Sequence, residues 1–119
     1  MNNKKIMISD IIDKHNLKAV TCPELSDREI KGGYASDLLS DVMANTKAGD
    51  IWVTLQGHPN IVAVAKLKEL AGIIIVNHRV PEEETLNKAR SENIIILTSD
   101  LPSFELIGKL HEVGISGKR

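Results

Sequence analysis

The sequence predicts an α/β domain with a mainly parallel sheet of about five strands and helices on both faces. Two runs, Ile73–Val76 and Ile94–Leu97, are apolar without polar alternation, which indicates strands buried on both faces. Strands and amphipathic helices alternate regularly after the first third of the chain, as in right-handed β-α-β crossovers. The 119 residues fit one domain, expected at 7–114, between a flexible N-terminal tail (1–6) and a C-terminal tail (115–119).

The first third of the chain predicts one helix and two short strands. Ile8, Ile11 and Ile12 recur at helical spacing, so a helix is expected from Met7 to Leu17. Asn16 suits the left-handed cap of that helix. The two candidate strands are residues 18–22 and residues 28–31, and the second ends at a glycine pair, Gly32-Gly33.

The rest of the chain predicts four helices and three strands. Pro59, Pro81 and Pro102 each stand where a helix begins, a position that tolerates the missing N–H of proline. Glu82, Glu83 and Glu84 complement the positive end of the helix that begins at Pro81. The helices are expected at 36–47, 59–70, 81–92 and from 102 onward, and the strands at 51–55, 73–76 and 94–97.

Composition excludes several classes of protein. Lys plus Arg is 15 and Asp plus Glu is 16, a net charge of −1, so no nucleic-acid footprint is expected. Cys22 is the single cysteine, which excludes an intramolecular disulfide and a cysteine-based metal site. No apolar run approaches the ~20 residues of a membrane span, and no secretory segment follows the first lysines, so we expect no membrane contact and a cytoplasmic location.

Polar segments follow four of the predicted strands and lead into helices. Ligands of open α/β sheets bind beyond the carboxyl ends of the strands, and free N–H groups at helix starts suit phosphate. The same residue types are also ordinary helix caps, so a ligand crevice and a purely structural role both stay open. The candidate ligand-binding residues are Gly32, Gly33, Ser36, Asp37, Gln56, His58, Asn60, Asn77, Thr98 and Ser99. No catalytic residue, metal ligand or cofactor is assigned.

Several side chains permit sharper hypotheses. Asp37 and Asp41 are four residues apart, so on one helix face they could hold a cation or form a solvated acidic face. His58 lies in a loop before a helix, a position suited to acid–base chemistry. His78 with Arg79 could meet a phosphate or form an exposed turn.

The run Asp27-Arg28, Gly32-Gly33 and then Tyr34 to Met43 resembles the DRTGG domain family. The segments Thr54 to Ala65 and Ser103 to Leu106 are also similar to stand-alone members, although Glu29-Ile30-Lys31 interrupts the name-giving motif. The resemblance implies a fold like the N-terminal domain of HPr kinase/phosphorylase. It also implies a regulatory module, found beside CBS domains in regulated pyrophosphatases, that helps dimerise or binds a nucleotide-like ligand.

Three functional hypotheses follow. The first is a non-catalytic sensing or interaction domain, a homodimer with an adenine-nucleotide-like or other phosphorylated ligand. The sequence has no phosphate-loop motif, so a kinase activity is not expected. The second is a small enzyme acting on a phosphorylated metabolite, with His58, Asn60 and Asp37 converging. The third is a structural partner of a larger enzyme, which an exposed contiguous apolar patch would favour.

Overall fold

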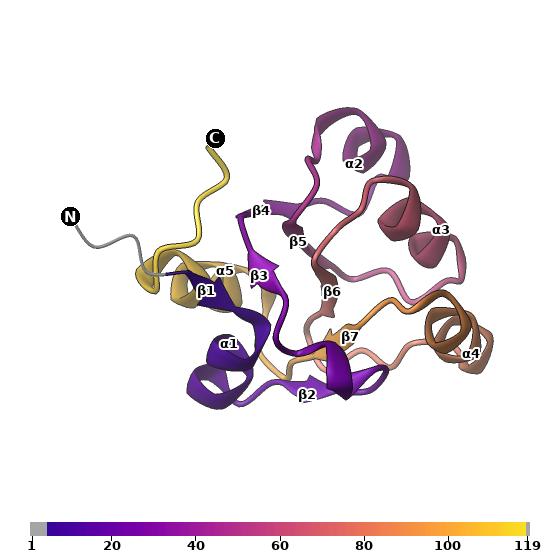
Figure 1. The fold of residues 1–119 in the computed structure, drawn as a ribbon, viewed down its shortest axis with the longest axis horizontal. Coiled ribbons are helices and arrows are strands. Elements are labelled where there is room, and N and C mark those ends of the chain that lie inside the picture. Colours follow the sequence, from indigo (N-terminus) through magenta and orange to yellow (C-terminus); the bar gives the residue numbers. More distant parts are fainter. Residues whose placement is uncertain (1–4, 119) are drawn as a thin grey trace.

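The computed structural model describes residues 5–118 and places one five-stranded sheet between two layers of helices (Figure 1). The helices are α1 (Ile8–His15), α2 (Leu39–Asn45), α3 (Asn60–Leu67), α4 (Glu83–Glu92) and α5 (Ser103–Glu112), with a 3₁₀ turn η1 (Pro23–Leu25). The strands are β1 (Ile6–Met7), β2 (Lys18–Ala19), β3 (Glu29–Ile30), β4 (Gly32–Ala35), β5 (Asp50–Thr54), β6 (Gly72–Ile75) and β7 (Ile96–Thr98). The predicted class, a mainly parallel α/β sheet, is confirmed.

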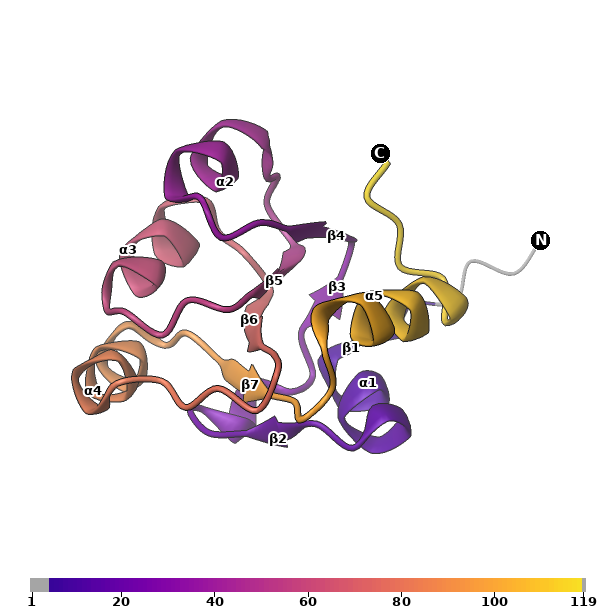
Figure 2. The same cartoon turned by 180° about the vertical axis from the view of Figure 1, so that it is seen from behind.

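The sheet has the strand order β2-β7-β6-β5-β4. Strands β4 to β7 are parallel to their neighbours, and β2 runs antiparallel to β7, with Lys18 opposite Thr98. Helices α2, α3 and α4 cover one face, whereas α1 and α5 cover the other (Figures 1 and 2). Strands β1 and β3 form a separate antiparallel pair.

The core has two aliphatic halves because alternate residues of the central strands point to opposite faces. Ile51 and Val53 join the cluster under α1 and α5, and Trp52 between them joins the cluster under α2, α3 and α4. Asn16 is the left-handed C-cap of α1, as its sequence position predicts. No helix in the described part of the chain is long and apolar enough to cross a membrane.

The structure corrects the region around the glycine pair. Gly32 and Gly33 lie inside β4, the edge strand, instead of forming a loop after a strand. The predicted strand 28–31 is reduced to β3, which lies outside the main sheet. Helix α2 begins at Leu39 instead of Ser36, so Asp37 precedes the helix.

Both predicted domain boundaries have structured residues just outside them. Ile6 pairs with Ile30 between β1 and β3. Ile115 is buried in the core under α5, and the carbonyl of Ser116 accepts the Gly33 N–H at 3.0 Å. Residues 1–4 of the predicted N-terminal tail lie outside the described residues.

Candidate functional site

The sequence-predicted site residues separate into two corners at the carboxyl ends of the strands. The first corner joins the loops that follow β4 and β5. Asp37 Oδ1 accepts hydrogen bonds from Thr54 Oγ1 at 2.8 Å and from the Leu55 N–H at 2.7 Å. Gln56 Nε2 donates to the Asp37 carbonyl at 3.1 Å. These polar groups are therefore used to hold the two loops together.

Asp37 and Asp41 accept hydrogen bonds from different partners. Asp41 accepts the Tyr34 hydroxyl at 2.9 Å and the side chain of Asn45 at 2.8 Å. Hydrogen bonds from Ser36 and then Tyr34 lower the pKa of Asp41, and the bond to Asp41 raises the pKa of Tyr34. No group of three or more potential metal-ligating side chains occurs among residues 5–118.

His58 and Asn60 are exposed and take part in hydrogen bonds at the start of α3. His58 Nδ1 accepts the Asn60 backbone N–H at 3.2 Å, and the His58 carbonyl accepts the Ile61 N–H at 3.1 Å. Neither side chain has a hydrogen bond to Asp37 within the described part of the chain. The convergence that a small enzyme would need at this corner is not present.

The second corner joins the loops that follow β6 and β7. Here β6 leads to α4 on one face and β7 leads to α5 on the other, the kind of switch point at which α/β sheets bind ligands. Asn77 and His78 have positive φ angles of 62° and 59° and form a tight turn, closed by Arg79 N–H to the Val76 carbonyl at 3.2 Å. The turn brings His78 Nδ1 to 2.5 Å from Asp100 Oδ1.

Main-chain hydrogen bonds connect these two loops directly. The Asn77 N–H donates to the Leu101 carbonyl at 2.7 Å, and the His78 N–H donates to the Ser99 carbonyl at 3.0 Å. Ser99 is buried, and its Oγ accepts the Leu101 N–H at 3.1 Å. The loops thus form a rigid platform, and open space lies on either side of it.

One part of this space, which we name the β7 hollow, lies beside β2 and has a volume of about 300 Å³. Its apolar lining comes from Val20, Val80, Pro81 and Leu86, and its polar lining from Lys18, His78, Arg79, Thr98, Ser99 and Asp100. Lys18 and Arg79 have no ion pair among residues 5–118. The hollow therefore combines an apolar wall with two cations and one carboxylate, that of Asp100, which lies beside His78.

A second hollow of about 300 Å³ lies on the other side of Ser99 and Asp100. Lys14, His15 and Lys109 line it, so cations flank the platform on both sides. Burial, followed by the charges of Lys109 and Lys14, lowers the pKa of His15 below its ordinary value, while Glu112 opposes this shift. The buried Nε2 of His15 has no hydrogen-bond partner in the described structure.

We expect His15 to make the fold less stable in mild acid. Its pKa is lower in the folded chain than the 6.5 of the unfolded chain, so the unfolded chain binds more protons as the pH falls below 6.5. The contribution of neutral His15 to the free energy of unfolding is complete above pH 6.5 and is lost as the pH falls through the folded-state pKa. Melting temperatures at pH 7.5 and 5.0 should therefore differ less for His15→Gln than for the natural chain. Equal differences would contradict this assignment, and His58→Gln is the control.

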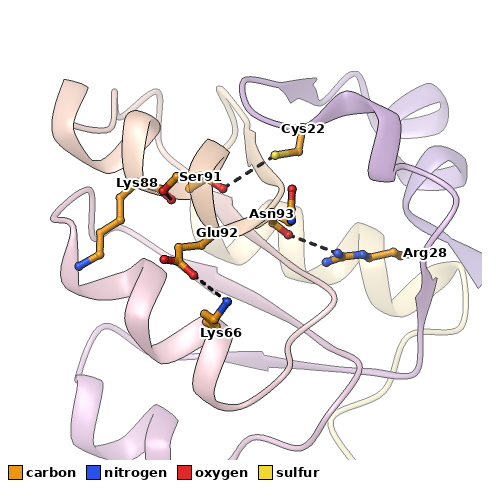
Figure 3. A network of polar contacts seen from close by, with 8 residues as sticks. Cys22, Arg28, Lys66, Lys88, Ser91, Glu92 and Asn93 are labelled. Carbon is orange, nitrogen blue, oxygen red and sulfur yellow. Dashed lines mark hydrogen bonds and ion pairs between the residues drawn. The ribbon is translucent and has the colours of Figure 1, made fainter.

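Arg28 and Gly33, which belong to the run that resembles the DRTGG family, have structural roles away from both corners. Arg28 donates to the carbonyl of Asn93, the C-cap of α4, at 3.2 Å, and Lys66 pairs with Glu92 at 2.7 Å (Figure 3). This ion pair lowers the pKa of Glu92. A Cβ on Gly33 would lie 3.1 Å from Ile115 Cγ2, so the glycine admits the C-terminal segment.

Comparison with known proteins gives a likeness of fold. No family model matches the chain, and no curated protein matches it. One solved structure, the CBS and DRTGG domains of the regulatory region of a Clostridium perfringens pyrophosphatase with the activator diadenosine tetraphosphate, aligns with a TM-score of 0.69 at 18% identity. The likeness supports a DRTGG-like fold. It covers 86% of this chain, which spans 44% of the pyrophosphatase chain.

The sequence identified Asn77, Thr98 and Ser99 of the second corner as candidates but missed Lys18, Lys14 and Lys109. Lysines are common on exposed surfaces and have no local signal of their own. Only the antiparallel pairing of β2 with β7 brings Lys18 to the carboxyl end of the sheet. His78 and Arg79 were recognised as a possible phosphate contact, and the structure places both in the β7 hollow.

Proposed function

We propose that this chain is a non-catalytic regulatory domain that binds a phosphorylated ligand, such as an adenine nucleotide, in the β7 hollow. The observation that carries the proposal is that Lys18 and Arg79 line the same hollow as the apolar side chains of Val80, Pro81 and Leu86. Cations attract phosphate, and an apolar wall accommodates a base. The volume, about 300 Å³, is at the lower end for small-molecule sites.

Further support comes from the cations beyond the platform. Lys14 and Lys109 lie across Ser99 and Asp100 from the β7 hollow, so a chain of phosphates could meet positive charge on both sides. The pyrophosphatase regulatory region of similar fold was solved with a diadenosine polyphosphate. The proposal includes a homodimer and the predicted likeness to the N-terminal domain of HPr kinase/phosphorylase.

A thermal-shift titration with AMP, ATP and diadenosine tetraphosphate tests the ligand. A ligand at one hundred times its Kd stabilises the folded state by about 2.7 kcal/mol. For a domain of this size that gain corresponds to a rise in melting temperature of roughly 10 °C. We expect this rise for at least one nucleotide in the natural chain.

Variants then locate the binding. Arg79→Gln and Lys18→Gln should each reduce the shift, because each removes a phosphate-binding charge from the hollow. Arg90→Gln is the matched control, since Arg90 bonds to Asn87 on the exposed side of α4 and does not line the hollow. Shifts of equal size in all three variants would contradict the proposed location, and no shift with any nucleotide would contradict the proposed ligand class.

A further inference from the structure

The β7 hollow contains a pair of ionisable side chains, His78 and Asp100, beside its two cations. His78 Nδ1 lies 2.5 Å from Asp100 Oδ1, and the two side chains are 80% and 84% exposed. Both residues line the hollow together with Lys18 and Arg79. A group that can gain a proton therefore lies inside the proposed phosphate site and is open to a ligand.

The backbone holds this pair in place. The His78 N–H donates to the carbonyl of Ser99, the residue before Asp100, at 3.0 Å, so a main-chain bond fixes the separation of the two loops. Asn77 and His78 have φ angles of 62° and 59°, a conformation that residues other than glycine rarely adopt and that is found most often at functional sites. The turn and the bond together keep the imidazole beside the carboxylate.

The contact with Asp100 decides which ring nitrogen of His78 remains for a ligand. An ionised carboxylate only accepts hydrogen bonds, so Nδ1 carries a proton, and Nε2 has no hydrogen bond among residues 5–118. In the neutral ring Nε2 has a lone pair, which repels a phosphate oxygen. In the protonated ring Nε2–H can donate to phosphate while Nδ1–H stays bound to Asp100.

The charged groups around His78 determine the direction of the effect. Asp100 favours a proton on the ring, and it is the only carboxylate that lines either hollow within the described part of the chain. The groups that oppose the proton are Lys18 and Arg79 in the β7 hollow, and Lys14, Lys109 and protonated His15 across the platform. An anionic ligand offsets these cations and attracts the proton, so ligand binding and protonation assist each other.

We propose that binding of a phosphorylated ligand in the β7 hollow is coupled to the uptake of a proton by His78, with Asp100 as the residue that positions the ring. Lys18, Arg79 and Asp100 give the lining a formal charge of +1, and protonated His78 raises it to +2. The charge of histidine ordinarily changes between about pH 5 and pH 8, so the site binds more tightly in mild acid. This inference rests on the proposed function.

Isothermal titration calorimetry of the full chain with diadenosine tetraphosphate tests the coupling. This ligand lacks the terminal phosphate of AMP or ATP, whose second ionisation falls at about pH 6, so its own charge stays constant between pH 8.0 and pH 6.0. We expect the Kd to fall by about fivefold over this range, near the upper limit for an exposed charge pair. Titrations at pH 7.0 in two buffers of different ionisation enthalpy should show net proton uptake.

Three variants locate the proton. His78→Gln should bind with little pH dependence and without proton uptake, because glutamine stays neutral. Asp100→Asn should move the pH dependence to lower pH, because an amide stabilises the protonated ring less than a carboxylate does. His111→Gln is the matched control, because His111 is exposed on α5 and lines neither hollow. Far-UV circular dichroism should show all three variants folded, since the replaced side chains are exposed.

The outcomes separate the coupling from the wider proposal. Proton uptake that His78→Gln abolishes and His111→Gln retains supports the inference. Proton uptake that is equal in the natural chain and His78→Gln, or absent from both, overturns the inference and leaves the ligand site. An unchanged pH profile in Asp100→Asn overturns the positioning role. No binding of diadenosine tetraphosphate at either pH also overturns the inference, and the thermal-shift titration with AMP and ATP then decides whether the proposed function stands.

Discussion

Replacing Trp52 by Ala is expected to lower the free energy of unfolding by about 4 kcal/mol. Trp52 is the single tryptophan and is fully buried under α2, α3 and α4. Its replacement by alanine leaves a cavity in an otherwise aliphatic cluster. The loss approaches the whole stability of many small domains, so urea unfolding followed by far-UV circular dichroism should show a markedly lower midpoint or an unfolded chain.

Trp52→Phe separates packing from hydrogen bonding at the same position. Trp52 Nε1 donates to the Ser36 carbonyl at 2.8 Å, which fixes the start of the loop that carries Asp37. Phenylalanine keeps most of the apolar contact and leaves this carbonyl without its donor, at a cost of about 1–3 kcal/mol. The variant should therefore fold with intermediate stability. Stability equal to the natural chain in both variants would contradict the packing described for this cluster.

Gly72→Ala should lower the free energy of unfolding by about 2 kcal/mol, although it adds one methyl group. The Cβ would lie 2.8 Å from Ile95 Cγ2 and 3.2 Å from the Ile95 carbonyl oxygen. The carbonyl belongs to the backbone beside β6 and accepts the Ile73 N–H, so it cannot move without breaking that bond. The added atom therefore strains the centre of the sheet.

Gly33→Ala is the matched control for this prediction. It places the same methyl group in a strand of the same sheet, at 3.1 Å from Ile115 Cγ2. The one close atom here is a side-chain methyl group near the C-terminus, whereas at Gly72 a backbone carbonyl also obstructs the added methyl group. We expect a loss of less than about 1 kcal/mol, since local repacking relieves such overlap. Equal midpoints for the two variants in urea would contradict the distinction.

The sequence predicted the elements whose signals are local. Ile8, Ile11 and Asn16 define α1, and the unbroken apolar runs at Ile73–Val76 and Ile94–Leu97 overlap β6 and β7. Each signal depends on periodicity or capping within one segment, and the structure confirms each one. The arrangement of helices on both faces follows from the alternation of these segments.

The sequence failed where distant contacts decide the local structure. Gly32 and Gly33 suggest a loop because glycine disfavours strands, but β4 needs a small residue where the C-terminal segment crosses. Ser36 and Asp37 are typical helix starts. Asp37 instead bonds to Thr54 and Leu55, so α2 begins only at Leu39. No local sequence pattern predicts either contact.

The candidate site was predicted in part for the same reason. The rule for strand ends identified Asn77, Thr98 and Ser99, which meet at the β6–β7 corner. The same rule grouped them with Asp37, His58 and Asn60, which are at or near the other corner. Sheet order separates the two sets, and sheet order depends on pairing between strands that single-strand patterns do not encode.

The central claim, a nucleotide site in the β7 hollow, is tested most directly by mapping amide shifts in two-dimensional NMR spectra during titration with diadenosine tetraphosphate. We predict that the largest and saturable shifts occur at Lys18, Arg79 and Ser99, with little change near Arg28 and Lys66 at the opposite end of the strands. Absence of saturable shifts at millimolar nucleotide, or shifts gathered at that opposite end, would contradict the claim.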